Sequence, residues 1–393
     1  MLAVIESHPV QYHAPVYRAL QTGFGIPVTA IYGSDFSVTG YRDMEFGADF
    51  AWDIDLLSGY APIFLSRVSP GGSRFFEEVS IRRLNATLRR IAPKAVLILG
   101  YGSRFNRVAF YEAWKMGCPI IFRGETTDHA RHRSLVKSFI RSWALRWTYR
   151  RVDRLLYIGK RSYQHYRRLN CPDDKLIFSP YCVDVSSFEP DDASRTRLRS
   201  ATRQILGISE EQIVLLFSGK FSRRKGPDLI LRAAKQLPSR IREDIVVVFL
   251  GSGQLIGELK QLAQDSPQIR VAFPGFQNQT QLSRYYHSAD LLVLPSREGE
   301  TWGLVVNEAL HHGIPCVISE AVGCGPDLIE QGITGHVFET GSPQSLALAL
   351  QQTLTLIDRD DVRRDCHLKV SGYSVEAAAK GIAEAYMQVV EQA

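Results

Sequence analysis

Two glutamates, Glu300 and Glu308, stand eight residues apart in a stretch that reads as a strand, a loop and then a helix. The helix is expected to begin near Gly303, so both carboxylates lie close to its N-terminal end. A helix N-terminus offers free N–H groups and a positive dipole to a phosphate, and a carboxylate accepts from two vicinal hydroxyls. Such a site suits a phosphorylated sugar. A solvated loop acid and a helix-surface acid have the same spacing, so that alternative stays open.

A cluster of cations follows the predicted strand 213–217. Gly219 lets the backbone turn closely, and the cations occupy the carboxyl end of the strand, where open α/β sheets bind ligands. They are Lys220, Arg223, Arg224 and Lys225. Fixed positive charge there would neutralise a diphosphate leaving group. The sequence lacks G-x-x-x-x-G-K-[ST], which excludes a P-loop, whereas a solvated basic turn remains the alternative.

The N-terminal half carries a second set of candidates. Arg123 and Glu125 follow the predicted strand 119–122, and we expect them to touch the reacting sugar. A buried ion pair made only for structure is the competing explanation. His8 and His13 flank the first strand-to-helix loop and are expected to face the same cleft, where either would contact donor or acceptor. A surface or capping role for these histidines also stays open.

Short apolar runs bounded by Gly or Pro alternate with amphipathic stretches, which is typical of parallel strands covered by helices. The predicted strands of the first half are 2–5, 28–32, 95–99, 119–122 and 155–158. Those of the second half are 213–217, 245–250, 269–273, 291–294 and 316–319. The sequence therefore predicts two α/β units in tandem.

The junction between these units is predicted near residue 190, because 186–203 is polar, highly charged and poor in large apolar residues. We expect a first domain over 1–189 and a second over 190–372. A C-terminal helix within 373–393 is expected to pack back toward the first domain. The cleft between the two domains is then the expected ligand site.

Composition limits the class of protein. The 393 residues are 45% hydrophobic and 22% charged, with a net charge of +6, which excludes a disordered or fibrous chain. The six cysteines are scattered without a C-x-x-C pair, so we expect a reducing compartment and neither a disulfide framework nor a zinc knuckle. The first residues do not resemble a signal peptide, and the apolar runs fall short of the ~20 residues that span a bilayer. A soluble or surface-bound protein is expected.

Positive charge is concentrated in residues 123–168. This segment contains thirteen Lys and Arg and three acidic residues, which gives a local net charge of 13 − 3 = +10. Aromatic residues are mixed with these cations, namely Phe139, Trp143, Trp147 and Tyr149. Two interpretations stay open: a solvated basic helix with its aromatic side chains in the core, or a segment that attaches to an anionic membrane surface or polyanion.

Two short patterns imitate metal sites. Asp53-Ile54-Asp55 resembles a D-x-D motif, and His129-x-x-His132 lies beside Asp128. Neither has the sequence context that such a site requires. We therefore expect both to be structural and predict no bound metal.

Several blocks of the second half together resemble the C-domain of retaining glycosyltransferases of family GT4, which have the GT-B fold. The blocks are SGKFSRRKG, FLGSGQ, FPGFQNQTQLSRYYHSADLLVLPS, EGETWGLVVNEALHHGIPCVIS and GCGPDLIEQGITGHVF. The segment PYCVDVSSF resembles the interdomain N-G-V-D-x-x-x-F of that family. The resemblance implies an α/β GT-B fold of two Rossmann-like domains whose parallel sheets face a central cleft. It also implies that 1–189 is the acceptor-side domain and 190–372 the nucleotide-sugar-binding domain.

The resemblance also implies roles for individual residues. Glu308 would bind the nucleotide ribose, Glu300 the hydroxyls of the donor sugar, and Lys220 and Lys225 the diphosphate, with Arg223 or Arg224 as a further cation. The donor site is expected to include Gly219, Phe276, Thr301, Trp302, Gly303 and Leu304. The family pattern is not met everywhere, since Lys220 replaces the usual Arg and Cys182 the usual Gly. The acceptor loop is replaced by ESHPVQYHAP.

The implied activity is transfer of a hexose, with retention, from a nucleotide diphosphate sugar to a hydroxyl of a lipid-linked or saccharide acceptor. Glycolipid or polysaccharide biosynthesis would be the setting, on the cytoplasmic side and peripherally at the inner face of the membrane. No cofactor, metal or nucleic acid is expected. A nucleotide-sugar 2-epimerase and a non-catalytic nucleotide-sugar-binding protein are the alternatives. The donor sugar, its base and the acceptor are not identified by the sequence.

Overall fold

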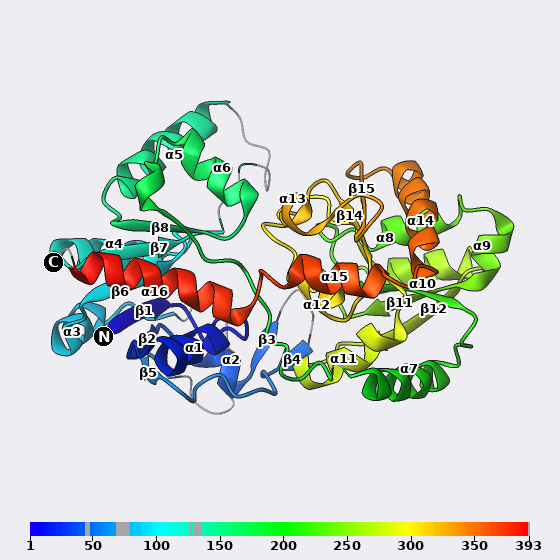
Figure 1. Cartoon of the computed structure of the whole chain (residues 1–393), viewed down its shortest axis with the longest axis horizontal. Helices are drawn as coiled ribbons and strands as arrows, with labels where there is room; N and C mark the ends of the chain where they lie inside the picture. The colour runs from blue at the N-terminus through cyan, green and yellow to red at the C-terminus, as the bar shows by residue number, and fades with distance from the viewer. Residues whose placement is uncertain (44–47, 68–78, 126–127, 129–134, 190, 392–393) are drawn as a thin grey trace.

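A computed structural model describes residues 1–43, 48–67, 79–125, 128, 135–189 and 191–391. Two α/β lobes lie side by side along the long axis (Figure 1). Each is built on a sheet whose strands are all parallel. Within the described residues, no helix is both long and apolar enough to cross a bilayer.

The N-terminal domain contains a seven-stranded sheet in the order β5-β2-β1-β6-β7-β8-β9. Its strands are β1 (Leu2–Glu6), β2 (Val28–Tyr32), β5 (Ala61–Phe64), β6 (Ala95–Leu99), β7 (Ile120–Arg123), β8 (Arg154–Tyr157) and β9 (Leu176–Phe178). The central strands are buried on both faces, which explains their continuous apolar runs. A separate antiparallel hairpin is formed by β3 (Tyr41–Asp43) and β4 (Ala48–Phe50).

Helices cover both faces of this sheet. One face packs against α1 (Ala14–Phe24) and the C-terminal helix α16 (Val375–Glu391). The other packs against α3 (Leu84–Ile91), α4 (Arg104–Lys115), α5 (Leu135–Tyr149) and α6 (Lys160–Arg168). The short α2 (Phe36–Thr39) follows β2.

The C-terminal domain has a six-stranded sheet in the order β12-β11-β10-β13-β14-β15. Its strands are β10 (Ile213–Ser218), β11 (Ile245–Leu250), β12 (Arg270–Gly275), β13 (Leu291–Leu294), β14 (Cys316–Ser319) and β15 (Gly335–Phe338). One face packs against α11 (Gln279–Ser288), α12 (Leu304–His311) and α15 (Val362–Val370). The other packs against α8 (Asp228–Ala234), α10 (Ile256–Gln264) and α14 (Pro343–Ile357). The remaining helices are α7 (Asp192–Leu206), α9 (Ser239–Asp244) and α13 (Gly325–Leu328).

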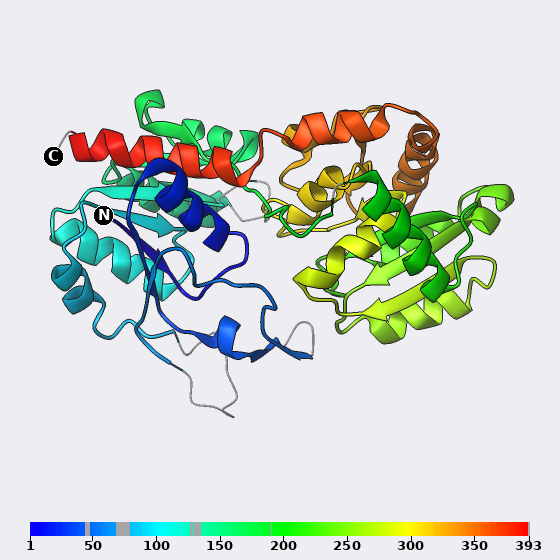
Figure 2. The same ribbon diagram turned by 60° about the horizontal axis from the view of Figure 1, so that its bottom comes forward.

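The last helix returns to the first domain. After α15 the chain crosses back, and α16 runs along the N-terminal domain (Figure 2). Ala378, Ala379 and Ile382 of α16 are buried in the same cluster as Leu20 of α1. Gly381 allows the closest approach, because a Cβ there would lie 2.0 Å from the carbonyl oxygen of Phe178. The final helix thus completes the core of the domain that begins the chain.

The predicted architecture of two parallel-sheet α/β units is confirmed, and the ten predicted strands agree with observed ones within two residues at each end. Short elements escaped prediction: the edge strands β5, β9 and β15 and the β3–β4 hairpin. β5 and β9 are partly exposed, and each missed edge strand has at most four residues, so none produces a long apolar run.

Candidate active site

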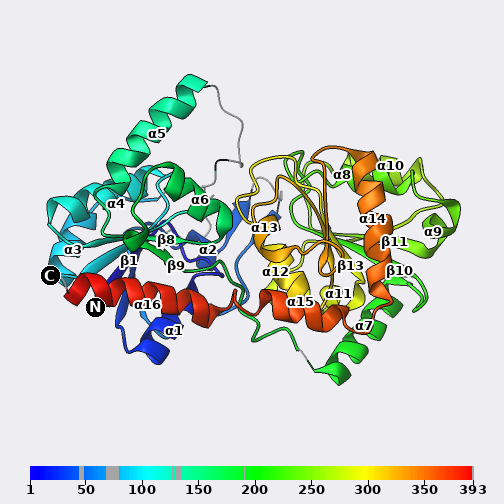
Figure 3. The same ribbon diagram turned by 45° about the horizontal axis from the view of Figure 1, so that its top comes forward.

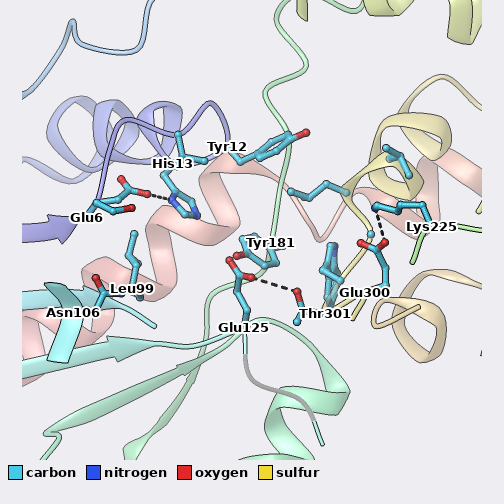
Figure 4. Close-up of a pocket in the computed structure, with 16 residues that line it drawn as sticks. Glu6, Tyr12, His13, Leu99, Asn106, Glu125, Tyr181, Lys225, Glu300 and Thr301 are labelled. Atoms are coloured by element: carbon cyan, nitrogen blue, oxygen red, sulfur yellow. Dashed lines mark hydrogen bonds and ion pairs between the residues drawn. The ribbon is translucent and has the colours of Figure 1, made fainter. Parts of the chain in front are cut away.

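A cleft of about 450 Å³ lies between the two domains, where the carboxyl ends of β1 and β7 face the loops after β10 and β13 (Figure 4). From the N-terminal side it is lined by Glu6, Ser7, Val10, Tyr12, His13, Leu99, Asn106 and Glu125. Tyr181 comes from the connecting segment, and Lys225, Glu300, Thr301, Trp302, Gly303, Leu304 and Val305 come from the C-terminal domain. Eight predicted site residues are therefore in the lining: His13, Glu125, Lys225, Glu300, Thr301, Trp302, Gly303 and Leu304.

Glu300 is held in place by cations of the loop that follows β10. Its Oε2 lies 2.5 Å from Lys225 Nζ and accepts from Ser296 Oγ at 2.9 Å, while Arg224 Nη1 is 3.9 Å away. Burial by itself would raise the pKa of Glu300, but Lys225 and Ser296 together hold that pKa below its ordinary value. The side chain is therefore a fixed anion at the edge of the cleft.

Glu308 has a different environment. It is buried on α12, where its Oε2 accepts from Tyr286 at 2.5 Å and its Oε1 from Tyr12 of the other domain at 3.4 Å. Burial raises the pKa of Glu308 to about 7, against the opposing effect of the two tyrosine hydroxyls. The two glutamates that the spacing linked are thus a permanent anion and a group that titrates near neutrality.

The start of α12 depends on a glycine. Gly303 adopts φ 107°, and a Cβ there would lie 2.9 Å from Val322 and 3.1 Å from Leu294. The neighbouring Trp302 is buried and donates from Nε1 to Asn307 Oδ1 at 2.8 Å, which fixes the loop against the helix. This local packing holds Glu300 and the helix N-terminus in one orientation toward the cleft.

The opposite wall has a buried hydrogen-bonded group that sequence reasoning found only in part. His13 Nδ1 lies 2.5 Å from Glu6 Oε1, and Tyr17 donates to Glu6 Oε2 at 3.0 Å. The His13 ring is parallel to that of Tyr181, with centroids 6.2 Å apart. Glu6, Tyr12 and Tyr181 were not predicted as site residues. Only Glu6 carried a usable signal, since it is an acid that ends a buried strand.

Glu125 and Arg123 have separate positions despite their proximity in sequence. Glu125 Oε2 accepts from Thr301 Oγ1 at 3.3 Å, which joins the two domains across the cleft. Arg123 is buried and donates to the carbonyl oxygens of Ser179 and Pro180, with its guanidinium 5.0 Å from the Tyr181 ring centroid. Its guanidinium therefore supports the segment that carries Tyr181, and Arg123 is not among the residues that line the cleft.

The remaining predicted residues are not part of the lining of the cleft. Gly219 and Lys220 follow β10 and are half-buried, as is Phe276 after β12. The His8 ring packs 4.4 Å from the Phe36 ring, and its Nδ1 is 2.9 Å from Ser7 Oγ. Burial lowers the pKa of His8 to about 4, so it is neutral at physiological pH.

The patterns that imitate metal sites have other partners. Asp53 accepts from the backbone and the hydroxyl of Thr280 in the other domain. Asp55 accepts from the amides of Leu57 and Ser58. His129 and His132 lie outside the described residues. Among the residues that are described, no group of three or more His, Cys, Asp or Glu is arranged to hold a metal ion.

The loops that carry Lys225 and Glu300 and the helix that carries Glu308 belong to one recognisable sequence unit. Residues 199–366 match the family model of glycosyl transferases group 1. The match spans β10 to α15, so it includes the whole C-terminal wall of the cleft. This similarity supports a group 1 type of glycosyltransferase.

Individual relatives agree with this match. A D-inositol 3-phosphate glycosyltransferase from Catenulispora acidiphila is 35% identical over 214 residues, covering 52% of this chain and 47% of the relative. A second, from Geodermatophilus obscurus, is 30% identical and covers 56% of this chain and 48% of the relative. The chain thus spans about half the length of the curated relatives it matches.

Solved structures establish the fold over the whole chain. Anabaena HepE, solved in complex with UDP and glucose, has a TM-score of 0.71 at 16% identity, covering 99% of this chain and all of HepE. The sucrose-phosphate synthase of Thermosynechococcus elongatus has a TM-score of 0.72 at 18% identity, covering all of this chain and 99% of the synthase. The fold is GT-B, as the sequence resemblance implied.

Proposed function

We propose that this protein is a retaining glycosyltransferase that moves a hexose from a nucleotide diphosphate sugar to a hydroxyl of an acceptor. One observation carries the proposal: the Glu300–Lys225 pair and the start of α12 face Glu125 and the Glu6–His13 pair across one cleft. A site with cations and carboxylates on one wall and a histidine on the other matches a phosphorylated sugar that must meet a second substrate.

The C-terminal wall is the proposed donor side. Glu308 would accept from the ribose hydroxyls, which requires its carboxylate to exchange the Tyr12 contact for the ligand. Glu300, fixed by Lys225, would accept from hydroxyls of the donor sugar. Lys225, Lys220 and Arg224 would balance the charge that develops on the leaving diphosphate. Because these cations are covalently part of the chain, we propose that transfer needs no metal ion.

The N-terminal wall is the proposed acceptor side. Glu6 orients the ring of His13, and Glu125 lies at the boundary between the two walls. We assign to these groups the positioning of the acceptor hydroxyl next to the donor sugar. Retention follows from the family resemblance: the leaving phosphate takes the acceptor proton on the face from which it departs, and no protein nucleophile is required.

We further propose a setting in glycolipid or polysaccharide biosynthesis, on the cytoplasmic side and peripherally at the membrane. Phe139 and Trp143 of α5 are 73% and 66% exposed, so the aromatic side chains of the basic segment do not all turn into the core. Aromatic and cationic side chains together suit the headgroup region of an anionic bilayer. The acceptor is then a lipid-linked molecule or a saccharide at that surface.

A thermal-shift panel of nucleotide sugars, followed by product analysis with the donor that binds, tests the proposal. A ligand at 100 times its Kd adds about 2.7 kcal/mol to the free energy of unfolding, enough to raise the melting temperature clearly. An α-configured product formed from an α-configured donor supports the assignment as a retaining glycosyltransferase. An inverted product contradicts retention, an epimerised sugar without transfer indicates the 2-epimerase, and binding without turnover indicates a non-catalytic protein.

A further inference from the structure

A second cavity, of about 310 Å³, lies in the N-terminal domain between α4 and α5. Its walls are mostly apolar and aromatic. They include Ile98, Phe110, Trp114, Phe122, Leu145 and Trp147. A monomeric protein seldom leaves such a set of large apolar side chains around an open groove unless something binds there.

The outer side of α5 continues this apolar surface. Val136, Phe139, Ile140, Trp143 and Trp147 are exposed and recur at helical spacing, so they form one stripe along the helix. Figure 3 shows α5 projecting from the top of the N-terminal domain. Trp147 belongs both to the stripe and to the groove. The groove therefore opens beside the exposed face of α5.

The charged residues near the stripe indicate what kind of surface it would contact. The sequence of α5 contains cations and no acidic residue. Lys137, Arg146 and Arg150 are exposed, and Arg151 lies 3.7 Å from the Trp147 ring centroid. Asp128 pairs with Arg141 of α5, with 3.4 Å between Nη1 and Oδ1. An apolar stripe on a helix whose own charged residues are all cations is complementary to an anionic lipid surface.

The groove and the cleft share one lining residue. Asn106 lines both cavities, and Leu99 in the cleft is followed by Gly100 in the groove. Asn106 Nδ2 donates to the carbonyl oxygen of Gly100 at 3.2 Å. Its Oδ1 is buried and has no hydrogen-bond partner among the described residues. An acceptor atom without a partner thus belongs to the residue that the apolar groove and the polar cleft share.

We propose that the acceptor is an amphiphilic lipid that occupies both cavities at once. Its apolar chain enters from the membrane side and lies between α4 and α5. Its polar head passes Asn106, donates a hydroxyl to the unpaired Oδ1, and places another hydroxyl in the cleft. This inference rests on the proposed function for the transfer step, but binding of the chain in the groove is independent of that step.

The first test measures binding in the groove without any turnover. Dansylundecanoic acid serves as the probe, because Trp114 and Trp147 in the groove would transfer excitation energy to its dansyl group. Ala144 lines the groove and is exposed at its edge, so Ala144→Trp fills the groove without entering the core. Each buried CH₂ contributes about 0.8 kcal/mol, so excluding even two of them weakens binding by about tenfold. Ala144→Ser is the matched control and should bind as the wild type does.

The second test asks whether the groove and the cleft act together. Dodecyl glucoside and methyl glucoside have the same head, and only the first has a chain for the groove. We expect dodecyl glucoside to change the consumption of the nucleotide sugar by the wild type at least about twofold through occupancy of the cleft. Methyl glucoside at the same concentration should have no such effect. In Ala144→Trp the effect of the dodecyl chain should be lost while basal consumption of the donor remains.

Several results would overturn the inference. They are absence of probe binding to the wild type, equal binding by Ala144→Trp, and a bound chain that leaves donor consumption unchanged. A dimer in sedimentation experiments that Trp143→Ser dissociates would show that a second copy of the chain covers this face instead. Failure of the proposed function is distinguishable, because donor consumption is then absent in every variant while the probe still reports on the groove.

Discussion

Tyr12 in the first loop of the N-terminal domain donates a hydrogen bond across the cleft to Glu308 on α12, with 3.4 Å between Tyr12 Oη and Glu308 Oε1. The same carboxylate accepts from Tyr286 of its own domain at 2.5 Å. Glu308, which we assign to nucleotide binding, is therefore also held by the opposite domain. We therefore expect ligand binding at Glu308 to be coupled to the relative position of the two domains through this contact.

The buried carboxyl of Glu308 should make stability depend on pH. Its pKa in the folded protein is raised by burial from 4.5 to about 7, so the folded protein retains a proton that the unfolded chain has lost between these values. The stabilisation from that proton is fully present below pH 4.5 and is lost as the pH rises through about 7. This loss amounts to at most about 3 kcal/mol of the free energy of unfolding. We expect Glu308→Gln to abolish it when the free energy of unfolding is measured in urea at several pH values. Glu298→Gln, at an exposed site in the preceding loop, is the control and should follow the wild type.

Removal of the Tyr12 hydroxyl should shift the pH profile of nucleotide binding. Both tyrosine hydrogen bonds act to lower the pKa of Glu308, so Tyr12→Phe should raise that pKa further. Calorimetric binding of UDP, if it needs ionised Glu308, should then reach half of its maximum at a higher pH in the variant. Tyr163→Phe, whose hydroxyl contacts Asp173 instead, should keep the wild-type midpoint. Identical pH profiles of UDP binding for Tyr12→Phe and the wild type would show that nucleotide binding does not depend on ionised Glu308.

Substitution of the two glutamates should affect nucleotide binding and turnover differently. Glu308→Ala is expected to weaken both the free nucleotide and the nucleotide sugar, because its carboxylate is assigned to the ribose. Glu300→Ala should lower turnover with little change in affinity for the free nucleotide. Loss of one charge-assisted contact is worth ~1.5 to 3 kcal/mol, or roughly 10- to 150-fold. Wild-type turnover in both variants would contradict the assignment.

Lys225 should be more important than its neighbour Arg223. Lys225 is paired with Glu300 in the cleft, whereas the Arg223 side chain is 75% exposed and lies 3.4 Å from Glu258. We expect Lys225→Ala to reduce kcat at least about 100-fold by removing charge at the leaving diphosphate, and Arg223→Ala to have little effect. Activity should also survive excess EDTA. An activity that EDTA abolishes and Mn²⁺ restores would overturn the metal-free mechanism.

The α5 stripe should mediate binding to anionic vesicles. Trp143→Ser and Phe139→Ser are expected to reduce co-sedimentation with phosphatidylglycerol vesicles, and added salt should weaken binding by the wild type because it screens the cations. Ile205→Ser removes an apolar side chain of similar exposure, 68%, from α7 in the other domain and should have no effect. Equal loss in all three variants would indicate nonspecific hydrophobic attachment. Absence of wild-type binding at low salt would favour a soluble acceptor.

The sequence by itself determined the architecture and much of the C-terminal wall. Runs such as 245–250 are apolar throughout because a parallel strand is buried on both faces, and this signal is local in the chain. The chemistry-bearing residues Lys225 and Glu300 follow such strands directly, so their place at a sheet edge could be inferred without coordinates. The same logic placed Glu125 and His13 at the facing edge.

Only the tertiary structure decided how these groups are paired. The Tyr12–Glu308 and Glu125–Thr301 contacts depend on how the two domains approach each other. The direction of Arg123 depends on where Ser179 and Pro180 pack. No periodicity in the sequence encodes either. The same holds for α5. Its composition allowed the aromatic side chains to face either the core or solvent, and the packing of Leu145 and Tyr149 into the core is what turns Phe139 and Trp143 outward. Side-chain direction on a helix is fixed by the face that is buried, and that face is chosen by long-range contacts.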